Sequence, residues 1–160
     1  MDRMRVGPEG RRLFVEWEGF KTSVYKDVVG NPTIGVGHLL TRDELSSGKI
    51  LINCRQVKYA NGLTEQQCWE LLDQDLGIAE DAVNACVTVP LTQNQFDVLV
   101  SFVFNAGVSA FAGSTLLKLL NNMQYDLVPA QLRRWVHSGR RIINGLVNRR
   151  EKEIELWNKN

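Results

Sequence analysis

The first helical signal in the chain is a stripe of apolar residues near its start. The stripe recurs at the spacing of one helix face over residues 9–20, at Leu13, Phe14, Trp17 and Phe20. Glycine commonly ends a helix because it adopts the left-handed backbone without strain. We therefore expect a helix that ends near Gly19 and carries Glu18 on its last turn.

The next segment changes from a helical to a β-type pattern. Residues 24–29 are rich in valine and tyrosine and predict a strand. Gly30-Asn31-Pro32 predicts a turn, and residues 33–38 a returning strand. The glycines of the second strand allow a ligand or another backbone to approach closely. We expect this hairpin to hold Asp27 and Thr33 near Glu18.

The middle of the chain contains one long amphipathic helix. Residues 39–62 are rich in loop signals, with a further strand expected around residues 50–57. Thr64 and Gln67 then form a capping-box pattern. The helix that follows, over residues 64–85, is long enough at about 1.5 Å per residue to connect two lobes.

The last part of the chain reads as helical throughout. A second capping-box pattern, Thr92 with Gln95, precedes an apolar helix that ends at residues 105–107. Further helices are expected at residues 109–122, 129–138 and 148–158. The pattern as a whole predicts an α+β fold that is mostly α.

These elements predict a single domain over residues 1–160, built from two lobes. The N-terminal α/β lobe is expected at about 20–62, the connecting helix at about 64–85, and the helical lobe at about 90–160. The N-terminal helix is expected to pack on the helical lobe. A cleft between the lobes is the default position for a binding site.

Charge is distributed unevenly along a chain that is nearly neutral. The net charge is +1 over 160 residues, of which 44% are hydrophobic. Residues 127–160 hold eight Lys or Arg against three acidic residues. A basic end suits an anionic partner, which could be nucleic acid, a membrane surface or an anionic glycan. Nucleic acid is not expected, because no aromatic stacking platform or finger motif accompanies the charge.

The sequence lacks the patterns typical of metal sites, disulfide frameworks and membrane-spanning segments. The three cysteines, Cys54, Cys68 and Cys86, have no metal-type spacing and form no disulfide framework. We expect no metal and no cofactor. The charged N-terminal residues contain no apolar signal region, and no run is long enough to span a membrane. Neither a cleaved signal nor a signal-anchor is therefore expected, and neither is stable membrane association.

Glu18, Asp27 and Thr33 form the candidate catalytic group. Two carboxyl groups and a hydroxyl held close together can cleave a glycosidic bond. One carboxyl protonates the leaving oxygen, and the other acts on water or attacks the sugar. The same residue types also occur at this spacing in inert domains, so the pattern of the whole segment matters.

Residues 18–38 resemble the active-site signature of the phage-type lysozymes, glycoside hydrolase family 24. The pattern E-G, Y-x-D, G-x-x-T-x-G-x-G-H stands here as Glu18-Gly19, Tyr25-Lys26-Asp27 and residues 30–38, without departure. Segments in the second half agree with the family as well, at residues 90–97, 104–107, 114–117, 134–135 and 145–151. The resemblance covers residues 8–158 and departs most at residues 45–59.

The resemblance implies a lysozyme-like fold and a muramidase. It implies that Glu18 is the general acid, that Asp27 steadies positive charge or activates water, and that Thr33 orients this water, with an inverting course. His38 and Asp75 would form a pair that supports the site. Arg149 would approach the catalytic glutamate from the last lobe. The resemblance also suggests substrate binding by Asn105, Phe104 and Gln95, although Gln95 could serve only as a helix cap.

Two other functions remain open at this stage. A lytic transglycosylase would cleave the same bond and form a 1,6-anhydro product, but such enzymes often lack counterparts of Asp27 and Thr33. A wall-binding module without activity is the second alternative. For a muramidase, the expected partners are bacterial peptidoglycan and, functionally, a holin for export. We expect a monomer made in the host cytoplasm that acts on the wall in the periplasm after the membrane is permeabilised.

Overall fold

The helix that carries Glu18 ends where the sequence predicts. In the computed structural model, which describes residues 2–159, α1 spans Pro8–Glu18. Gly19 follows with a φ of +79°, in the region where glycine is favoured over other residues. The peptide N–H of Gly19 donates to the carbonyl oxygen of Val15, which closes the last turn.

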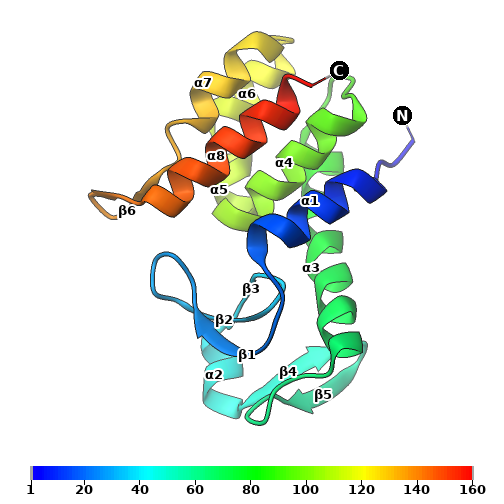
Figure 1. The fold of residues 1–160 in the computed structure, drawn as a ribbon. Coiled ribbons are helices and arrows are strands. Elements are labelled where there is room, and N and C mark those ends of the chain that lie inside the picture. Colours follow the sequence, from blue (N-terminus) through cyan, green and yellow to red (C-terminus); the bar gives the residue numbers. More distant parts are fainter. Residues whose placement is uncertain (1, 160) are drawn as a thin grey trace. The chain divides into compact units, whose positions relative to one another are not determined.

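The chain divides into two compact units, and each is described by itself. Residues 13–77 form the hairpin unit, and the described residues before and after this range form the helical unit. Figure 1 labels the elements along the chain. In the hairpin unit, the elements after α1 are β1 (Lys21–Lys26), β2 (Pro32–Gly35), β3 (His38–Leu39), α2 (Arg42–Ser47), β4 (Lys49–Ile52), β5 (Arg55–Lys58) and the first part of α3 (Glu65–Cys86).

The hairpin unit contains a three-stranded and a two-stranded antiparallel sheet. Strands β1, β2 and β3 are hydrogen-bonded in that order, and β4 pairs with β5. The core of the unit gathers side chains from these strands and from α3: Ile34, Leu40, Ile50, Ile52, Tyr59, Leu63, Cys68 and Leu71. Burying this apolar surface fixes the strand that carries Thr33 against α3.

The first strand is shifted along the chain, and the second is shorter than predicted. In place of the strand predicted over residues 24–29, β1 begins at Lys21 and ends at Lys26, and Val28 and Val29 lie in a turn. The returning strand is divided into β2 and β3, because Gly35 and Gly37 both have positive φ, at 69° and 67°. These backbone angles reverse the chain between the two strands.

Helix α2 lies in the segment that the sequence analysis treats as loops. Its first turn is a complete capping box, in which Thr41 Oγ1 accepts from the N–H of Glu44 and the Glu44 side chain accepts from the N–H of Thr41. This is the same pattern that correctly predicts the starts of α3 at Thr64 and of α4 at Thr92.

The helical unit consists of the end of α3 and a series of further elements. These are α4 (Gln93–Ala106), α5 (Val108–Ala112), α6 (Thr115–Asn121), the 3-10 turn η1 (Tyr125–Leu127), α7 (Val128–Leu132), β6 (His137–Ser138), β7 (Arg141–Ile142) and α8 (Asn144–Trp157). The prediction of an α+β fold that is mostly α is confirmed.

Three helix predictions in this unit need correction. The helix predicted over 109–122 is broken at Gly113, and Ser114 caps a new helix by accepting from the N–H of Leu117. The helix predicted over 129–138 stops at Leu132 and is followed by the β6–β7 hairpin. Helix α8 begins at Asn144, four residues before its predicted start.

Candidate active site

Glu18 is held at the end of α1 against a glycine of the hairpin. Its side chain is half-buried. A Cβ atom placed on Gly37 would lie 2.5 Å from Glu18 Oε2 and 2.8 Å from Glu18 Cδ. Real side-chain atoms do not approach this closely, so the carboxyl group rests directly on the backbone of residue 37. Gly37, the second glycine of the G-x-G-H motif, therefore leaves the space that the Glu18 carboxyl group occupies.

The side chain of Asp27 stabilises the turn that follows it in the chain. Its Oδ1 accepts hydrogen bonds from the backbone N–H groups of Val29 at 3.0 Å and Asn31 at 2.8 Å. Side-chain acceptance of nearby N–H groups competes with strand pairing. This explains why Val28 and Val29 leave the strand despite their β propensity. The two bonds fix one carboxylate oxygen, and in the described structure Oδ2 makes no hydrogen bond or ion pair.

Thr33 lies in β2, directly opposite Tyr25 of β1. Its side chain is buried, and its hydroxyl donates to the carbonyl oxygen of Asn31 at 2.9 Å. Because the hydroxyl proton is used in this bond, the remaining lone pairs of Oγ1 are acceptors. A water molecule bound by Thr33 would therefore be the donor.

The pKa of the Tyr25 phenol is affected by both carboxyl groups. Burial raises the pKa of Tyr25, and the charges of Glu18 and Asp27 raise it further, while the backbone N–H of Gly37 lowers it. The Tyr25 hydroxyl also donates to the carbonyl oxygen of Glu18 at the long distance of 3.5 Å. Tyr25 belongs to the Y-x-D part of the sequence motif, whose pattern alone does not indicate a role for the phenol. Both carboxyl groups therefore lie near enough to the Tyr25 phenol to raise its pKa.

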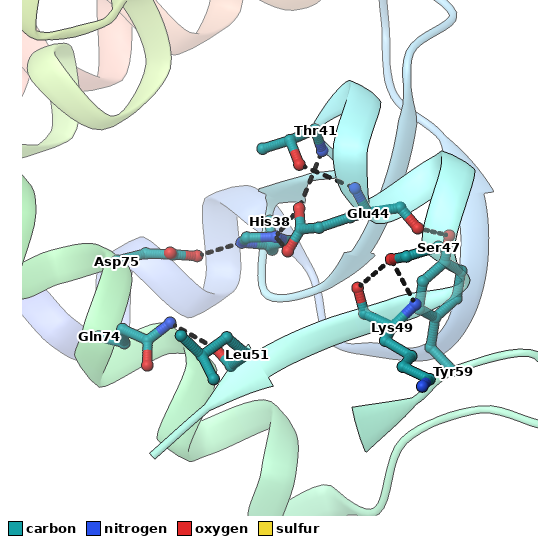
Figure 2. A network of polar contacts seen from close by, with 9 residues as sticks. All are labelled: His38, Thr41, Glu44, Ser47, Lys49, Leu51, Tyr59, Gln74 and Asp75. Atoms are coloured by element: carbon teal, nitrogen blue, oxygen red, sulfur yellow. Dashed lines mark hydrogen bonds and ion pairs between the residues drawn. The ribbon is translucent and has the colours of Figure 1, made fainter. Parts of the chain in front are cut away.

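His38 connects three elements of the hairpin unit (Figure 2). Its Nδ1 lies 2.7 Å from Asp75 Oδ2 on α3, as the family resemblance implies. Its Nε2 lies 3.0 and 3.1 Å from the two carboxylate oxygens of Glu44 on α2, a second partner that the sequence analysis misses. Burial lowers the His38 pKa, but the hydrogen bonds and charges of Asp75 and Glu44 raise it more, so the net shift is upward.

The network around His38 also fixes the start of α2. Glu44 Oε1 accepts from the N–H of Thr41 at 2.8 Å, and the Tyr59 hydroxyl donates to the Glu44 carbonyl oxygen at 2.8 Å. Because β2 pairs with β3 through Ile34 and His38, this network bears on the strand that holds Thr33. A role for His38 as a base is not favoured, since both ring nitrogens already face carboxylates.

The remaining candidates lie in the helical unit. Arg149 is buried, and its Nε donates to Ser101 Oγ at 3.1 Å and lies 3.5 Å from Glu153 Oε2. Asn105 is exposed, and its Oδ1 accepts from Arg150 Nη2 at 2.7 Å. This bond fixes the amide so that its NH₂ group is the end left to donate.

Gln95 and Phe104 both lie on α4. Gln95 Oε1 accepts from the N–H of Thr92 at 2.9 Å, so it completes the capping box of α4. Phe104 is half-buried near the end of the same helix. The structure thus brings Glu18, Asp27 and Thr33 together in one unit and Arg149 with Asn105 through one polar cluster in the other.

Metal and membrane features were also sought in the structure. Within residues 2–159, no group of three or more His, Cys, Asp or Glu side chains could hold a metal ion. All three cysteines are free, with Cys54 exposed, Cys86 half-buried and Cys68 buried. In the same range, the helices are either too short or too polar to cross a bilayer.

The side chains of the hairpin unit form a combination that suits acid–base chemistry. One carboxyl group sits at a helix end on a glycine backbone, and a second has one anchored and one available oxygen. A hydroxyl with acceptor capacity lies on the neighbouring strand. This combination suits hydrolysis, in which one group donates a proton and another directs water.

Comparison with known proteins identifies similar chains. The family model described as "Phage lysozyme" matches residues 15–153. The endolysin of Salmonella phage P22 is 38% identical over 154 residues, which cover 96% of this chain and 98% of that protein. The endolysin of Bacillus phage PZA is 37% identical over 157 residues, and the chain spans only 55% of its length.

The fold has close counterparts among solved structures. An endolysin from Escherichia coli O157:H7 phage FAHEc1 superimposes with a TM-score of 0.80 at 29% sequence identity. The match covers 99% of this chain and 96% of that one. The expected lysozyme-like fold is therefore confirmed.

Proposed function

Because this chain belongs to the phage lysozyme family, we propose that Glu18, Asp27 and Thr33 are the catalytic residues of a muramidase. The chain is a lysozyme-type glycoside hydrolase of phage-driven host lysis, and its substrate is peptidoglycan. The bond cleaved is the β-1,4 linkage between N-acetylmuramic acid and N-acetylglucosamine. The observation that carries the proposal is the seating of the Glu18 carboxyl on Gly37, within the hairpin that bears Asp27 and Thr33.

Glu18 acts as the general acid. Its position at the end of α1 is defined by the helix stop at Gly19 and by the Gly37 backbone beneath it. A positioned acid saves the entropy of orientation that a free acid in solution would lose. Protonation of the glycosidic oxygen by Glu18 allows the bond to the anomeric carbon to break.

Asp27 and Thr33 act on the other reactant. Asp27 keeps Oδ1 in the turn and presents Oδ2 to the developing positive charge or to the attacking water. Thr33 accepts a hydrogen bond from this water, since its own proton is donated to Asn31. An inverting course requires room for water between the two carboxyl groups, about 6.5–9.5 Å, and is the outcome we propose.

Supporting roles follow for the other candidates. His38 and Asp75, together with Glu44, hold β3 on α2 and α3 and so stabilise the neighbouring strand. Asn105 offers an oriented NH₂ donor to the carbonyl oxygen of an acetamido group. Phe104, Gln95 and Arg149 are proposed to assist on the family resemblance alone.

The proposal extends to the biological setting. The protein is made in the host cytoplasm and acts as a monomer on the wall in the periplasm. A holin permeabilises the membrane and so provides the route, without a physical complex. These statements rest on family membership.

Digestion of purified peptidoglycan tests the catalytic proposal. Wild type, Glu18→Gln and Glu16→Gln are compared, where Glu16 is an exposed carboxylate on the same helix. Wild type and Glu16→Gln should release reducing ends, whereas Glu18→Gln should lose lysis almost completely and remain folded. Mass analysis of the products distinguishes hydrolysis from 1,6-anhydro products, which would assign a transglycosylase. Wall binding without any cleavage would assign a binding module.

A further inference from the structure

The β6–β7 hairpin carries positive charge that the rest of the described chain does not neutralise. We use the name arginine hairpin for residues 134–142, which include Arg134, Arg140 and Arg141. All three side chains are exposed. No acidic residue lies between positions 127 and 150.

These three arginines differ from the other arginines of the same region. Arg133 pairs with Glu151 through two hydrogen bonds, and Arg149 and Arg150 are buried beside Glu153. By contrast, within residues 2–159, Arg134, Arg140 and Arg141 form no ion pair or hydrogen bond through their side chains. Their charge is therefore available to a partner outside the chain.

The hairpin has a folded base. His137 pairs with Ile142, and Ser138 pairs with Arg141. Beneath them the N–H of Ile143 donates to the carbonyl oxygen of Val136 at 2.9 Å, and Val136 is buried. Figure 1 shows the hairpin as a narrow loop that projects from the start of α8. A charged group on a fixed loop loses less conformational entropy on binding than one on a free tail.

The chemistry of the hairpin favours carboxylates on a polymer. A guanidinium group matches a carboxylate through two parallel hydrogen bonds. A membrane partner is less suitable, because Ile142 is the one exposed large apolar residue of the hairpin, and interfacial binding needs a broader apolar face. Trp135, which also belongs to the hairpin, packs edge-on against Phe102 with ring centroids 5.2 Å apart, so its ring is part of the packing of the helical unit.

We propose that the arginine hairpin is a second wall-binding surface, which holds the carboxylates of peptidoglycan stem peptides. The inference rests on the proposed function, since it adds a contact to the same substrate. Catalysis uses the glycan strand, while the hairpin retains the enzyme on the wall through the peptides. The contact is electrostatic, so it weakens as salt concentration rises.

Sedimentation with purified peptidoglycan tests this proposal. Both variants are made in the Glu18→Gln background, so that the wall is not degraded during the measurement. Arg140→Gln/Arg141→Gln removes two hairpin charges. Arg55→Gln/Lys58→Gln removes two exposed charges from β5 and is the matched control. The hairpin variant should bind about three- to tenfold more weakly than its parent, from two exposed ion pairs, and the control should bind like the parent.

A second substrate isolates the stem peptides. Glycan strands stripped of peptides by an amidase should bind the parent and the hairpin variant equally. Equal losses in the control variant, no loss in the hairpin variant, or a loss that persists on stripped strands would each overturn the proposal. Hairpin-dependent binding to vesicles of phosphatidylglycerol and phosphatidylethanolamine, with unchanged wall binding, would assign the hairpin to the membrane instead.

The failure of this proposal can be separated from failure of the proposed function. Wild type and the hairpin variant with intact Glu18 are both incubated with stripped glycan strands. Release of reducing ends by both shows that catalysis is intact, whatever the binding result. If neither releases reducing ends, the muramidase proposal fails, and the premise of the hairpin proposal fails with it.

Discussion

The carboxyl group of Glu18 occupies the space that a side chain at position 37 would need. The Gly37 Cα faces the carboxyl, with Glu18 Oε2 2.5 Å from the ideal Cβ position. The same glycine has a φ of +67°, so its backbone angle and its lack of a side chain both matter. Loop geometry and the placement of the candidate acid thus depend on one residue.

Gly37→Ala is therefore predicted to damage activity more than stability. The added methyl group must displace the Glu18 side chain, and the left-handed backbone adds about 1–2 kcal/mol of strain. Gly48→Ala is the control, because Gly48 has a similar φ of 72° but nothing within 4 Å of the added atom. Urea unfolding and lysis are measured for both. If the Gly37→Ala variant lysed cells as fast as the Gly48→Ala variant, the contact between Glu18 and Gly37 would not matter for activity.

The His38 network predicts a stability contribution that depends on pH. Protonated imidazolium can donate to Asp75 and Glu44 at once, whereas the neutral ring can donate to one only. The folded pKa is raised above 6.5. The stabilisation is therefore complete below the unfolded pKa of about 6.5 and is lost as pH rises through the folded pKa.

Asp75→Asn should consequently cost about 1.5–3 kcal/mol at pH 5, the range for hydrogen bonds to charged groups, and much less at pH 9. Urea unfolding from pH 5 to pH 9 measures the difference from wild type. Asp43→Asn, on the exposed first turn of α2, removes the same charge outside the network. A cost for Asp75→Asn that stays constant across this range would contradict the assignment. The chain's other histidine, the exposed His137, gives a reference signal in an NMR titration.

Local signals in the sequence were sufficient for part of this picture. The stop at Gly19 and the capping boxes at Thr64 and Thr92 depend on contacts within one turn, and the structure has them as predicted. The capping box at Thr41 has the same local pattern, although the turn residues around it favour a loop. These helix ends are determined by residues within one turn of each other, so a sequence pattern can predict them.

Other features depend on contacts that no spacing encodes. The turn of Val28 and Val29 follows from side-chain hydrogen bonds of Asp27, which override the β propensity of valine. The pairing of His38 with Glu44 joins a strand to a helix that was not expected. The candidate catalytic residues were found because a family pattern spans them, whereas the geometry of Gly37 and Glu18 required the structure.

Two glycines in helices predict opposite effects of the same substitution. A methyl group on Gly10 of α1 would overlap the carboxylate of Asp97, which accepts from the Gln93 side chain at 2.8 Å. Gly10→Ala should destabilise the protein by about 1–3 kcal/mol through overpacking. Gly77 of α3 has nothing within 4 Å of the added atom, so Gly77→Ala should stabilise by about 0.5–1 kcal/mol.

Denaturant unfolding of both variants measures whether the free energy of unfolding falls for Gly10→Ala and rises for Gly77→Ala. The Asp97→Ala background then tests whether the Asp97 carboxylate is the cause. Asp97→Ala removes the carboxylate and leaves only the Cβ atom of residue 97, 3.0 Å from the added methyl group, so Gly10→Ala should cost much less in that background. If Gly10→Ala costs as much without the Asp97 carboxylate as with it, the steric explanation is wrong.

The buried pair of Arg150 and Glu153 predicts strong non-additivity. Arg150 Nε lies 2.7 Å from Glu153 Oε1, and both side chains are almost fully buried. Ser101 donates to Glu153 Oε2 at 2.6 Å, and the Arg150 guanidinium lies 5.2 Å from the centroid of the Phe102 ring. Removing Glu153 takes the carboxylate from Arg150 and also from Arg149, whose Nε lies 3.5 Å from Glu153 Oε2. Removing Arg150 leaves Glu153 with that longer contact to Arg149. Breaking a buried ion pair in this way typically costs about 3–5 kcal/mol.

Removing both charges should therefore cost less than the sum of the single changes. We expect Glu153→Leu and Arg150→Met each to lower the free energy of unfolding by about 3–5 kcal/mol. The double variant should recover only part of that loss, because it still leaves the buried Arg149 without the Glu153 carboxylate. A double-mutant cycle in urea gives the coupling energy directly. Arg133→Met with Glu151→Leu is the control, since that pair is exposed and should couple by about 1 kcal/mol or less. Additive costs at Arg150 and Glu153 would show that the buried charges do not depend on each other.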